Sequence, residues 1–288
     1  MTAPRRPVFR PSPATMPMSR SIPGARRHSP ALAAAAAALL LAVPAAAQET
    51  RDAFQWSGRV EAGRVLYVKN MNGAIRVERG GSEVEITARK RWRRGDPESV
   101  RIEQQRVDGG DVLVCALWND GTCSPTSYRG RNENRGWGRN ENDVNVEFTV
   151  RIPEGVRLDL YTVNGGIEVD GATAEVRAHT VNGGIRAASL GGPVEAQTTN
   201  GGINVRMGRV GSEALRFSTT NGSITIEAPR DLDAELSMST VNGSIESDYP
   251  LTVQGRIDRR RIEATLGNGG PRIEAKTVNG SVTLKRGN

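Results

Sequence analysis

The stretch TVNGGI at residues 162–167 decides the fold, because close variants of it return through the second half of the chain. Their asparagines are separated by 18, 18, 21, 21 and 37 residues and are Asn164, Asn182, Asn200, Asn221, Asn242 and Asn279. A period near twenty residues indicates a repeat protein in which neighbouring units complete one another's core. The longest interval has room for one imperfect unit around residues 268–269, and an earlier copy lies upstream at Asn72.

Strand side chains alternate sides with a period of two, so aligning the units on their asparagines identifies the buried positions. Positions four before and five after the asparagine are mostly apolar, and the position two before it is always threonine in these six units. The position three after it holds Ile167, Ile185, Ile203, Ile224, Ile245 and Val282. The intervening positions are mostly polar, so we expect two short strands with one apolar face around each Asn-Gly corner.

An Asn-Gly pair between strands is also typical of an ordinary β-hairpin, since glycine and asparagine tolerate positive φ. A meander of hairpins has no reason to repeat one phrase, whereas a coil that returns to the same place does. Stacked coils place like residues about 4.8 Å apart, and columns of Thr and Asn can hydrogen-bond along the stack. We therefore predict an all-β fold, a right-handed parallel β-helix (β-solenoid), over residues 151–288.

Residues 48–150 are predicted to form a strand-rich N-terminal region. A hairpin is expected whose two strands include residues 100–102 and residues 112–114, on either side of Asp108-Gly109-Gly110. Residues 119–143 are polar and glycine-rich, which indicates a long loop or a disordered insertion.

The first 47 residues read as a secretory signal peptide. They contain six arginines and no acidic residue, then an apolar run, and then Ala45-Ala46-Ala47 as a cleavage site. Of 39 basic residues 33 remain after cleavage, against 32 acidic ones, so the net charge falls from +7 to about +1. No later apolar run is long enough to cross a membrane. We expect an exported protein, periplasmic or extracellular, without a transmembrane anchor in the mature chain and without nucleic acid as a partner.

The two cysteines of the chain, Cys115 and Cys123, are separated by eight positions. Two nearby cysteines in an exported chain most often form a disulfide. The spacing excludes a CxxC redox motif.

The order of motifs carries a family resemblance. NGAI at residues 72–75 precedes a charged hairpin and a variable loop, and VRIPEGVRLDL at residues 150–160 then leads into the TVNGGI repeats. Over roughly residues 60–286 this order resembles the bacterial domain-of-unknown-function family labelled "putative adhesin", although many relatives have Ser-Gly-Asp at the corner. The resemblance implies a β-helix-like fold at the envelope or cell surface, and it brings no catalytic residues.

Two surfaces are candidates for binding. The polar loop region offers aromatic rings and guanidinium groups that stack on sugars or pair with anionic polymers. Its candidate ligand residues are Trp118, Tyr128, Arg131, Trp137 and Arg139, and the alternative is a solvated loop without a partner. The residues just before each repeat asparagine form an outward Val and Thr stripe, which could bind a flat partner or be ordinary β surface. The repeat asparagines themselves are assigned a structural role.

Catalysis has little support in the sequence. His179 is the single histidine after the signal peptide and occupies an outward position. Neither a metal-ligand cluster nor a nucleotide or cofactor motif is present. The leading interpretation is a non-catalytic adhesin or envelope structural protein whose partner is an envelope polysaccharide or another surface protein. The alternatives are a polysaccharide-active β-helix enzyme, which needs clustered acids, and an envelope-stress accessory protein. The sequence does not set the oligomeric state.

Overall fold

The computed structural model describes residues 49–129, 143–253 and 260–287. The predicted signal peptide lies outside these residues. The chain from Ala45 onward forms one compact unit, in which the described residues are strands, short 3-10 turns and loops without any α-helix. No described segment is a helix long and apolar enough to cross a membrane.

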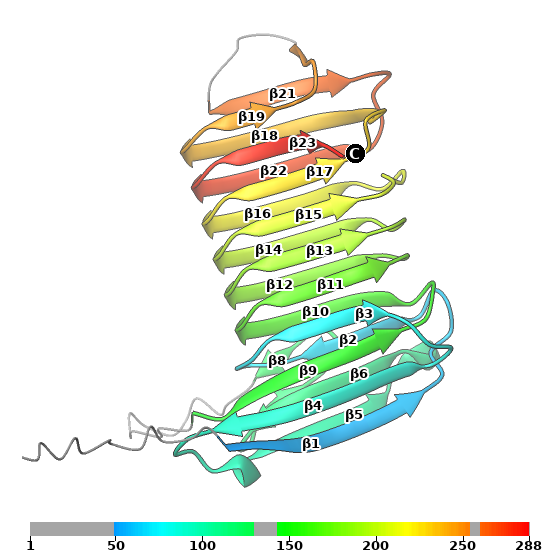
Figure 1. Cartoon of the computed structure of the whole chain (residues 1–288), viewed down its shortest axis with the longest axis vertical. Coiled ribbons are helices and arrows are strands. Elements are labelled where there is room, and N and C mark those ends of the chain that lie inside the picture. Colours follow the sequence, from blue (N-terminus) through cyan, green and yellow to red (C-terminus); the bar gives the residue numbers. More distant parts are fainter. Residues whose placement is uncertain (1–48, 130–142, 254–259, 288) are drawn as a thin grey trace, which may run out of the picture. The chain divides into compact units, whose positions relative to one another are not determined.

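Two large sheets enclose the core of this unit (Figure 1). The first has the strand order β1 (Glu49–Gly58), β4 (Val84–Trp92), β9 (Asn145–Ile152), β3 (Ile75–Arg79), β11 (Ile167–Ala172), β13 (Ile185–Ser189), β15 (Ile203–Met207), β17 (Ile224–Ala228), β23 (Val282–Arg286) and β19 (Ile245–Ser247). The second has the order β20 (Thr252–Val253), β21 (Arg261–Leu266), β18 (Ala234–Asn242), β22 (Arg272–Asn279), β16 (Leu215–Asn221), β14 (Val194–Asn200), β12 (Val176–Asn182), β10 (Arg157–Asn164), β2 (Val65–Lys69), β6 (Val112–Trp118) and β5 (Val100–Arg106). A separate two-stranded hairpin pairs β7 (Thr122–Cys123) with β8 (Tyr128–Arg129), and 3-10 turns cover Pro97–Ser99 and Asp108–Gly110.

The repeats stack in parallel and in register, which confirms the predicted β-solenoid. We call two strands joined by an Asn-Gly corner a rung. Within the second sheet Asn164 lies opposite Asn182, which belongs to the next rung, and within the first sheet Ile167 lies opposite Ile185. Each repeat therefore returns to the same place one strand further along, as the constant phrase predicts.

The apolar columns of the sequence alignment form the interior of the solenoid. Ile203 is 0% exposed, and the position four before each repeat asparagine is also buried, from Leu160 in one rung to Phe217 in another. Burying one such large aliphatic side chain stabilises the fold by roughly 1.5–3 kcal/mol. The core is thus one continuous strip rather than a set of separate clusters.

The asparagine column is a hydrogen-bonded ladder. Each amide nitrogen Nδ2 donates to Oδ1 of the neighbouring asparagine, with donor–acceptor distances of 2.7–2.8 Å. In spatial order it contains Asn72, Asn164, Asn182, Asn200, Asn221, Asn279 and Asn242. The buried threonine two positions earlier donates its hydroxyl to a glycine carbonyl of the adjoining rung, at 2.8–3.0 Å. The two columns thus join each corner to the next by side-chain hydrogen bonds.

The two glycines of the corner have different roles. A Cβ on Gly183 would overlap the carbonyl oxygen of Gly165 in the adjoining rung, whereas a Cβ on Gly184 would lie 3.3 Å from the carbonyl oxygen of Gly202. The first position is therefore always glycine, while the second is serine in three rungs. Positive φ explains the corner glycine in only two rungs, since Gly73 and Gly280 have φ of 127° and 148° while the first corner glycines of the other rungs and all the corner asparagines lack it.

This difference predicts opposite outcomes for two neighbouring substitutions. Gly183→Ala should lower the free energy of unfolding by about 1–3 kcal/mol, because the rungs must separate to admit the methyl group. Gly184→Ala should change it by no more than about 0.5 kcal/mol, since the contact of its Cβ is tight but small and three other rungs carry serine at this position. Urea denaturation of both variants measures the difference, and equal stabilities would contradict this account of the corner.

The order of rungs in space differs from their order in sequence at the C-terminus. Strands β22 and β23 lie between β16–β17 and β18–β19, so the last repeat of the chain is the second-last rung of the stack (Figure 1). The predicted imperfect unit around residues 268–269 is wrong. Those residues form the turn from β21 to β22, because β21 pairs antiparallel with β18 instead of adding a parallel rung.

The N-terminal strands belong to the same stack, so the domain boundary we predicted at residue 150 is not a boundary in the fold. Strands β2 and β3 form the rung of Asn72, which pairs directly with the rung of Asn164. On the other side of this rung, β6 pairs in parallel with β2 and β9 pairs in parallel with β3. Strand β6 therefore ends, and β9 begins, on the side of the stack where other rungs have an Asn-Gly corner.

Antiparallel strands close both sheets at the N-terminal end of the parallel stack and the second sheet at the other end, where the first sheet ends on the parallel strand β19. Strand β4 pairs with β9 and β1, and β5 pairs with β6, as the predicted hairpin requires. At the other end β21 pairs with β18. Terminal units of different structure are what a repeat protein needs to protect its outermost strand edges.

Candidate functional site

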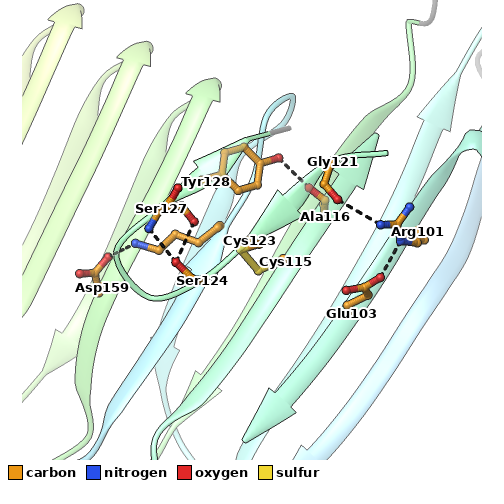
Figure 2. Close-up of a disulfide and its surroundings, with 11 residues drawn as sticks. Arg101, Glu103, Cys115, Ala116, Gly121, Cys123, Ser124, Ser127, Tyr128 and Asp159 are labelled. Carbon is orange, nitrogen blue, oxygen red and sulfur yellow. Dashed lines mark hydrogen bonds and ion pairs between the residues drawn. A yellow bond between two sulfur atoms is a disulfide. The ribbon is translucent and has the colours of Figure 1, made fainter. Parts of the chain in front are cut away.

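A disulfide-linked hairpin covers the outer face of the second sheet at its N-terminal end. The hairpin is β7–β8, and Cys123 of β7 is bonded to Cys115 of β6, with 6.4 Å between their Cα atoms (Figure 2). The predicted disulfide is therefore present. Within the segment that we expected to be a long loop or a disordered insertion, Thr122–Cys123 and Tyr128–Arg129 form strands, and the described residues between them are loop.

Two further contacts fix the hairpin (Figure 2). The hydroxyl of Tyr128 donates to the carbonyl oxygen of Ala116 at 2.6 Å, and burial raises the pKa of this hydroxyl. On the other side, the guanidinium of Arg101 donates to the carbonyl oxygens of Asn119 and Gly121. Covalent and polar contacts thus hold the hairpin at both ends, which gives it a defined position on the sheet.

Burial on both faces explains why β6 is apolar throughout. Its outward side chains Leu113, Cys115 and Leu117 are at most 2% exposed and pack against Tyr67 and Tyr128, among others. An uninterrupted apolar run such as residues 112–118 is the pattern of a strand covered on both sides. That run was the sequence signal for the hairpin's position.

Loss of the disulfide should destabilise the protein by about 2–3 kcal/mol, the chain-entropy cost of freeing so short a loop. The variant carrying Cys115→Ser and Cys123→Ser should melt lower than the parent. Thermal melting followed by circular dichroism tests this, with the parent under reducing conditions as the matched comparison. An unchanged melting temperature in both would contradict the assigned role of the disulfide.

A hollow of about 380 Å³ lies beside the hairpin turn. Its floor comes from outward side chains of β2, β10, β12 and β14, and the hairpin contributes Pro125 and Thr126. The polar and aromatic side chains of the floor are Lys69, Asp159, Tyr161, Arg177, His179, Glu195 and Gln197. Because these strands are consecutive neighbours in the sheet, the hollow extends across successive rungs.

Aromatic rings follow one another across the floor. The ring centroids of Tyr128 and Tyr161 are 5.5 Å apart, and those of Tyr161 and His179 are 5.4 Å apart. Both pairs are tilted. Tyr161 and His179 make no side-chain hydrogen bond within the described parts of the chain, so their polar atoms are available to a ligand.

The charged groups of the hollow are paired. The Nζ atom of Lys69 lies 2.6 Å from Oδ1 of Asp159. Arg177 contacts two carboxylates: its Nη2 lies 2.5 Å from Oε1 of Glu175, which does not line the hollow, and its Nε lies 3.7 Å from Oε2 of Glu195, which does. Gln197 donates to Glu195 at 2.9 Å. Two cations and two carboxylates therefore face the hollow without a net charge.

His179 carries the clearest electrostatic signature of the hollow. Burial lowers its pKa below the ordinary value of 6.5, and nearby Lys69 lowers it further, while Asp159 and Glu195 act in the opposite direction. The imidazole is therefore neutral at pH 7, with one nitrogen as donor and one as acceptor.

The depressed pKa predicts a loss of stability in weak acid. The unfolded chain binds a proton near pH 6.5 that the folded chain resists, so stability is complete above pH 6.5 and falls as the pH drops below it. Urea denaturation at pH 7.5 and pH 5 should show a larger loss for the parent than for His179→Gln. Equal losses would show that His179 does not contribute.

Of the five predicted ligand residues, the structure places one in the core and one beside the hollow. Trp118 is 3% exposed and belongs to the core, so the expectation that its ring contacts a ligand is wrong. Tyr128 is half-buried in the hairpin and contacts the hollow's aromatic row. Arg131, Trp137 and Arg139 lie outside the described residues. The Val and Thr stripe is partly exposed, most clearly at Val241, which is 52% exposed.

The sequence reasoning missed most of the hollow. Lys69, Tyr161, His179 and Gln197 share one column, three positions before the asparagine, which the alignment of buried columns did not include. Reading that outward column would have put a basic, two ring-bearing and one amide side chain on successive rungs. Among the described residues no group of three His, Cys, Asp or Glu side chains could hold a metal ion.

Comparison with known proteins gives a family and a fold. The family model described as Toastrack DUF4097 matches residues 142–285. No curated protein matches the sequence.

Several solved structures are similar. A crystal structure described as a "putative cell adhesion protein" from Clostridium sporogenes has 12% identity and a TM-score of 0.41, covering 82% of this chain and 100% of that chain. A "putative adhesin" from Bacteroides fragilis has 13% identity and a TM-score of 0.26, with coverages of 84% and 98%. A "putative lipid binding protein" from Parabacteroides distasonis has 10% identity and a TM-score of 0.28, with coverages of 84% and 97%.

Proposed function

The chain belongs to the Toastrack DUF4097 family, and we propose that it is an exported, non-catalytic β-solenoid that binds an envelope polysaccharide or another surface component. The hollow beside the disulfide-linked hairpin is the observation that carries this proposal. It combines partly exposed aromatic rings with paired polar groups on a sheet, which is the composition of a binding site. The N-terminal leader and the disulfide support export, since disulfides persist in oxidising compartments.

Binding is favoured over catalysis by the state of the two carboxylates in the hollow. Asp159 and Glu195 come from β10 and β14, with β12 between them, and each contacts a cationic side chain. A glycosidase needs one carboxyl group held protonated as the general acid, which a neighbouring cation opposes. The pairing of these two carboxylates with cations therefore favours binding over glycosidic cleavage in the hollow.

Co-sedimentation tests the proposal. The mature chain, residues 48–288, is mixed with purified cell walls and capsular polysaccharide, and bound protein is measured as a function of polymer concentration. We expect saturable binding, and we expect no new reducing ends or unsaturated sugars in the supernatant. Absence of binding would overturn the proposal, and release of sugar products would replace it with the enzymatic alternative.

A variant without residues 130–142 distinguishes binding at the surface that contains the hollow from binding by the deleted segment. Binding that survives this deletion locates the site on the described surface that contains the hollow. Binding that disappears, in a variant with an unchanged melting temperature, locates it in the deleted segment and contradicts the assignment to the hollow.

A further inference from the structure

We propose that the hollow beside the hairpin is a subsite for a neutral saccharide, in which a pyranose ring packs against Tyr161 and His179. This inference rests on the proposed binding function and adds the class of ligand. Three features of the hollow carry it, namely its size and position, its aromatic floor and its charge balance.

Size and position favour one or two rings of a polymer. A volume of about 380 Å³ lies at the lower end of the range of small-molecule sites, roughly 300–1,000 Å³. The floor spans β2, β10, β12 and β14, whose side chains repeat at the strand spacing of about 4.8 Å. The hairpin turn at Pro125 and Thr126 borders the hollow, while the outer face of the sheet continues along later rungs. An extended chain can therefore enter the hollow and continue along the sheet.

The aromatic floor suits the apolar face of a sugar. Tyr161 and His179 are on neighbouring strands in register, and their rings are 5.4 Å apart. Tyr128 braces Tyr161 from the hairpin side at 5.5 Å, and its own hydroxyl is committed to Ala116. An aromatic ring that is already held in place contributes contact area at a low entropic cost.

Charge balance distinguishes a neutral sugar from an anionic one. A uronate or phosphate chain would meet Asp159 and Glu195 as well as Lys69 and Arg177, so its attraction and repulsion offset one another. Sugar hydroxyls both donate and accept, so they match carboxylates, the guanidinium and the Gln197 amide together. Similar pairs of opposite charge lie elsewhere on the same sheet, such as Arg216 with Glu274, without aromatic rings beside them.

The test uses hexasaccharides of defined chemistry and the mature chain. Isothermal titration calorimetry is run with maltohexaose, cellohexaose and chitohexaose as neutral probes and with hexagalacturonate as the anionic probe. We expect at least one neutral probe to bind, and hexagalacturonate to bind more weakly. Tyr161→Ala should reduce the affinity at least tenfold, while Tyr161→Phe, which keeps the ring, should stay within about threefold of the parent. Ser218→Ala, in the same outward column outside the hollow, is the matched control and should leave the affinity unchanged.

Melting temperatures separate a lost contact from a lost fold, and His179→Ala serves as the second variant if Tyr161→Ala melts early. Three results would overturn the subsite: no neutral probe binds, hexagalacturonate binds more tightly than every neutral probe, or both ring variants bind like the parent. In each case a protein that still co-sediments with cell walls keeps the proposed function and loses only the subsite. A protein that binds neither loses both.

Discussion

A chain that ends at Gly270 is expected to lose its cooperative fold, although the deletion removes the C-terminal repeat alone. The deleted strands β22 and β23 occupy an interior position in the stack, between β16–β17 and β18–β19. Their inward side chains Ile273, Val282 and Leu284 are fully buried, which corresponds to roughly 5–9 kcal/mol of hydrophobic stabilisation at about 1.5–3 kcal/mol each. The free energy of unfolding of a typical domain is about 5–15 kcal/mol, so the lost stabilisation is comparable to the whole stability of the fold.

The matched control removes β1, which is the first described strand of the chain and also an edge strand of its sheet. Strand β1 is the edge of the first sheet and pairs with β4 alone among the described strands, so a chain without Glu49–Gly58 should melt only moderately lower. Differential scanning calorimetry of the two truncated proteins compares them. Equal melting temperatures would contradict the interior position of the last repeat.

Ile203→Asp should lower the free energy of unfolding as much as any single substitution in the chain. Ile203 is 0% exposed and lies between Ile185 and Ile224 in the column that forms the middle of the core. The substitution forfeits roughly 1.5–3 kcal/mol of buried aliphatic surface. It also places a carboxylate in an apolar interior, for which several further kcal/mol are lost unless the group takes up a proton. Several rungs on either side should unfold together, because each rung is completed by its neighbours.

Asn204→Asp is the control for this substitution. It introduces the same side chain at the next residue of the same strand, but Asn204 points outward and is exposed. We expect a free energy of unfolding within about 0.5 kcal/mol of the parent for Asn204→Asp. Far-ultraviolet circular dichroism during urea denaturation measures both, and a parent-like transition for Ile203→Asp would disprove the solenoid core.

The sequence alone was sufficient for the parts of the fold that depend on local repetition. A constant phrase with a fixed period requires like residues to lie side by side, and the Asn, Thr and Ile columns follow from that condition. The disulfide followed equally directly from the spacing of Cys115 and Cys123. The alternation of apolar and polar positions also identified which face of each strand is buried.

The order of the rungs could not be obtained in the same way. Every rung from Asn164 onward presents the same Thr and Asn at its edges, so the columns do not distinguish a neighbour in sequence from a more distant repeat. The antiparallel pairing of β21 with β18 decides the order, and β21 carries no repeat phrase. Trp118 and the hollow were missed for a related reason. Both depend on the β7–β8 hairpin, which folds over the outer face of the second sheet. The alternation pattern of a single strand does not show that another segment packs on its outer face.

Cysteine cross-linking tests the stacking order most directly. Ser218 of β16 and Lys276 of β22 are register partners, and Lys276 is also the partner of Ser239 in β18. Neighbouring strands lie about 4.8 Å apart, within the Cα separation of a disulfide, whereas Ser218 and Ser239 are two strands apart and beyond it. The pair Ser218→Cys with Lys276→Cys should therefore oxidise to a cross-linked chain, and the pair Ser218→Cys with Ser239→Cys should remain reduced. The reverse result, a bond between positions 218 and 239 and none between 218 and 276, would contradict the inserted C-terminal rung.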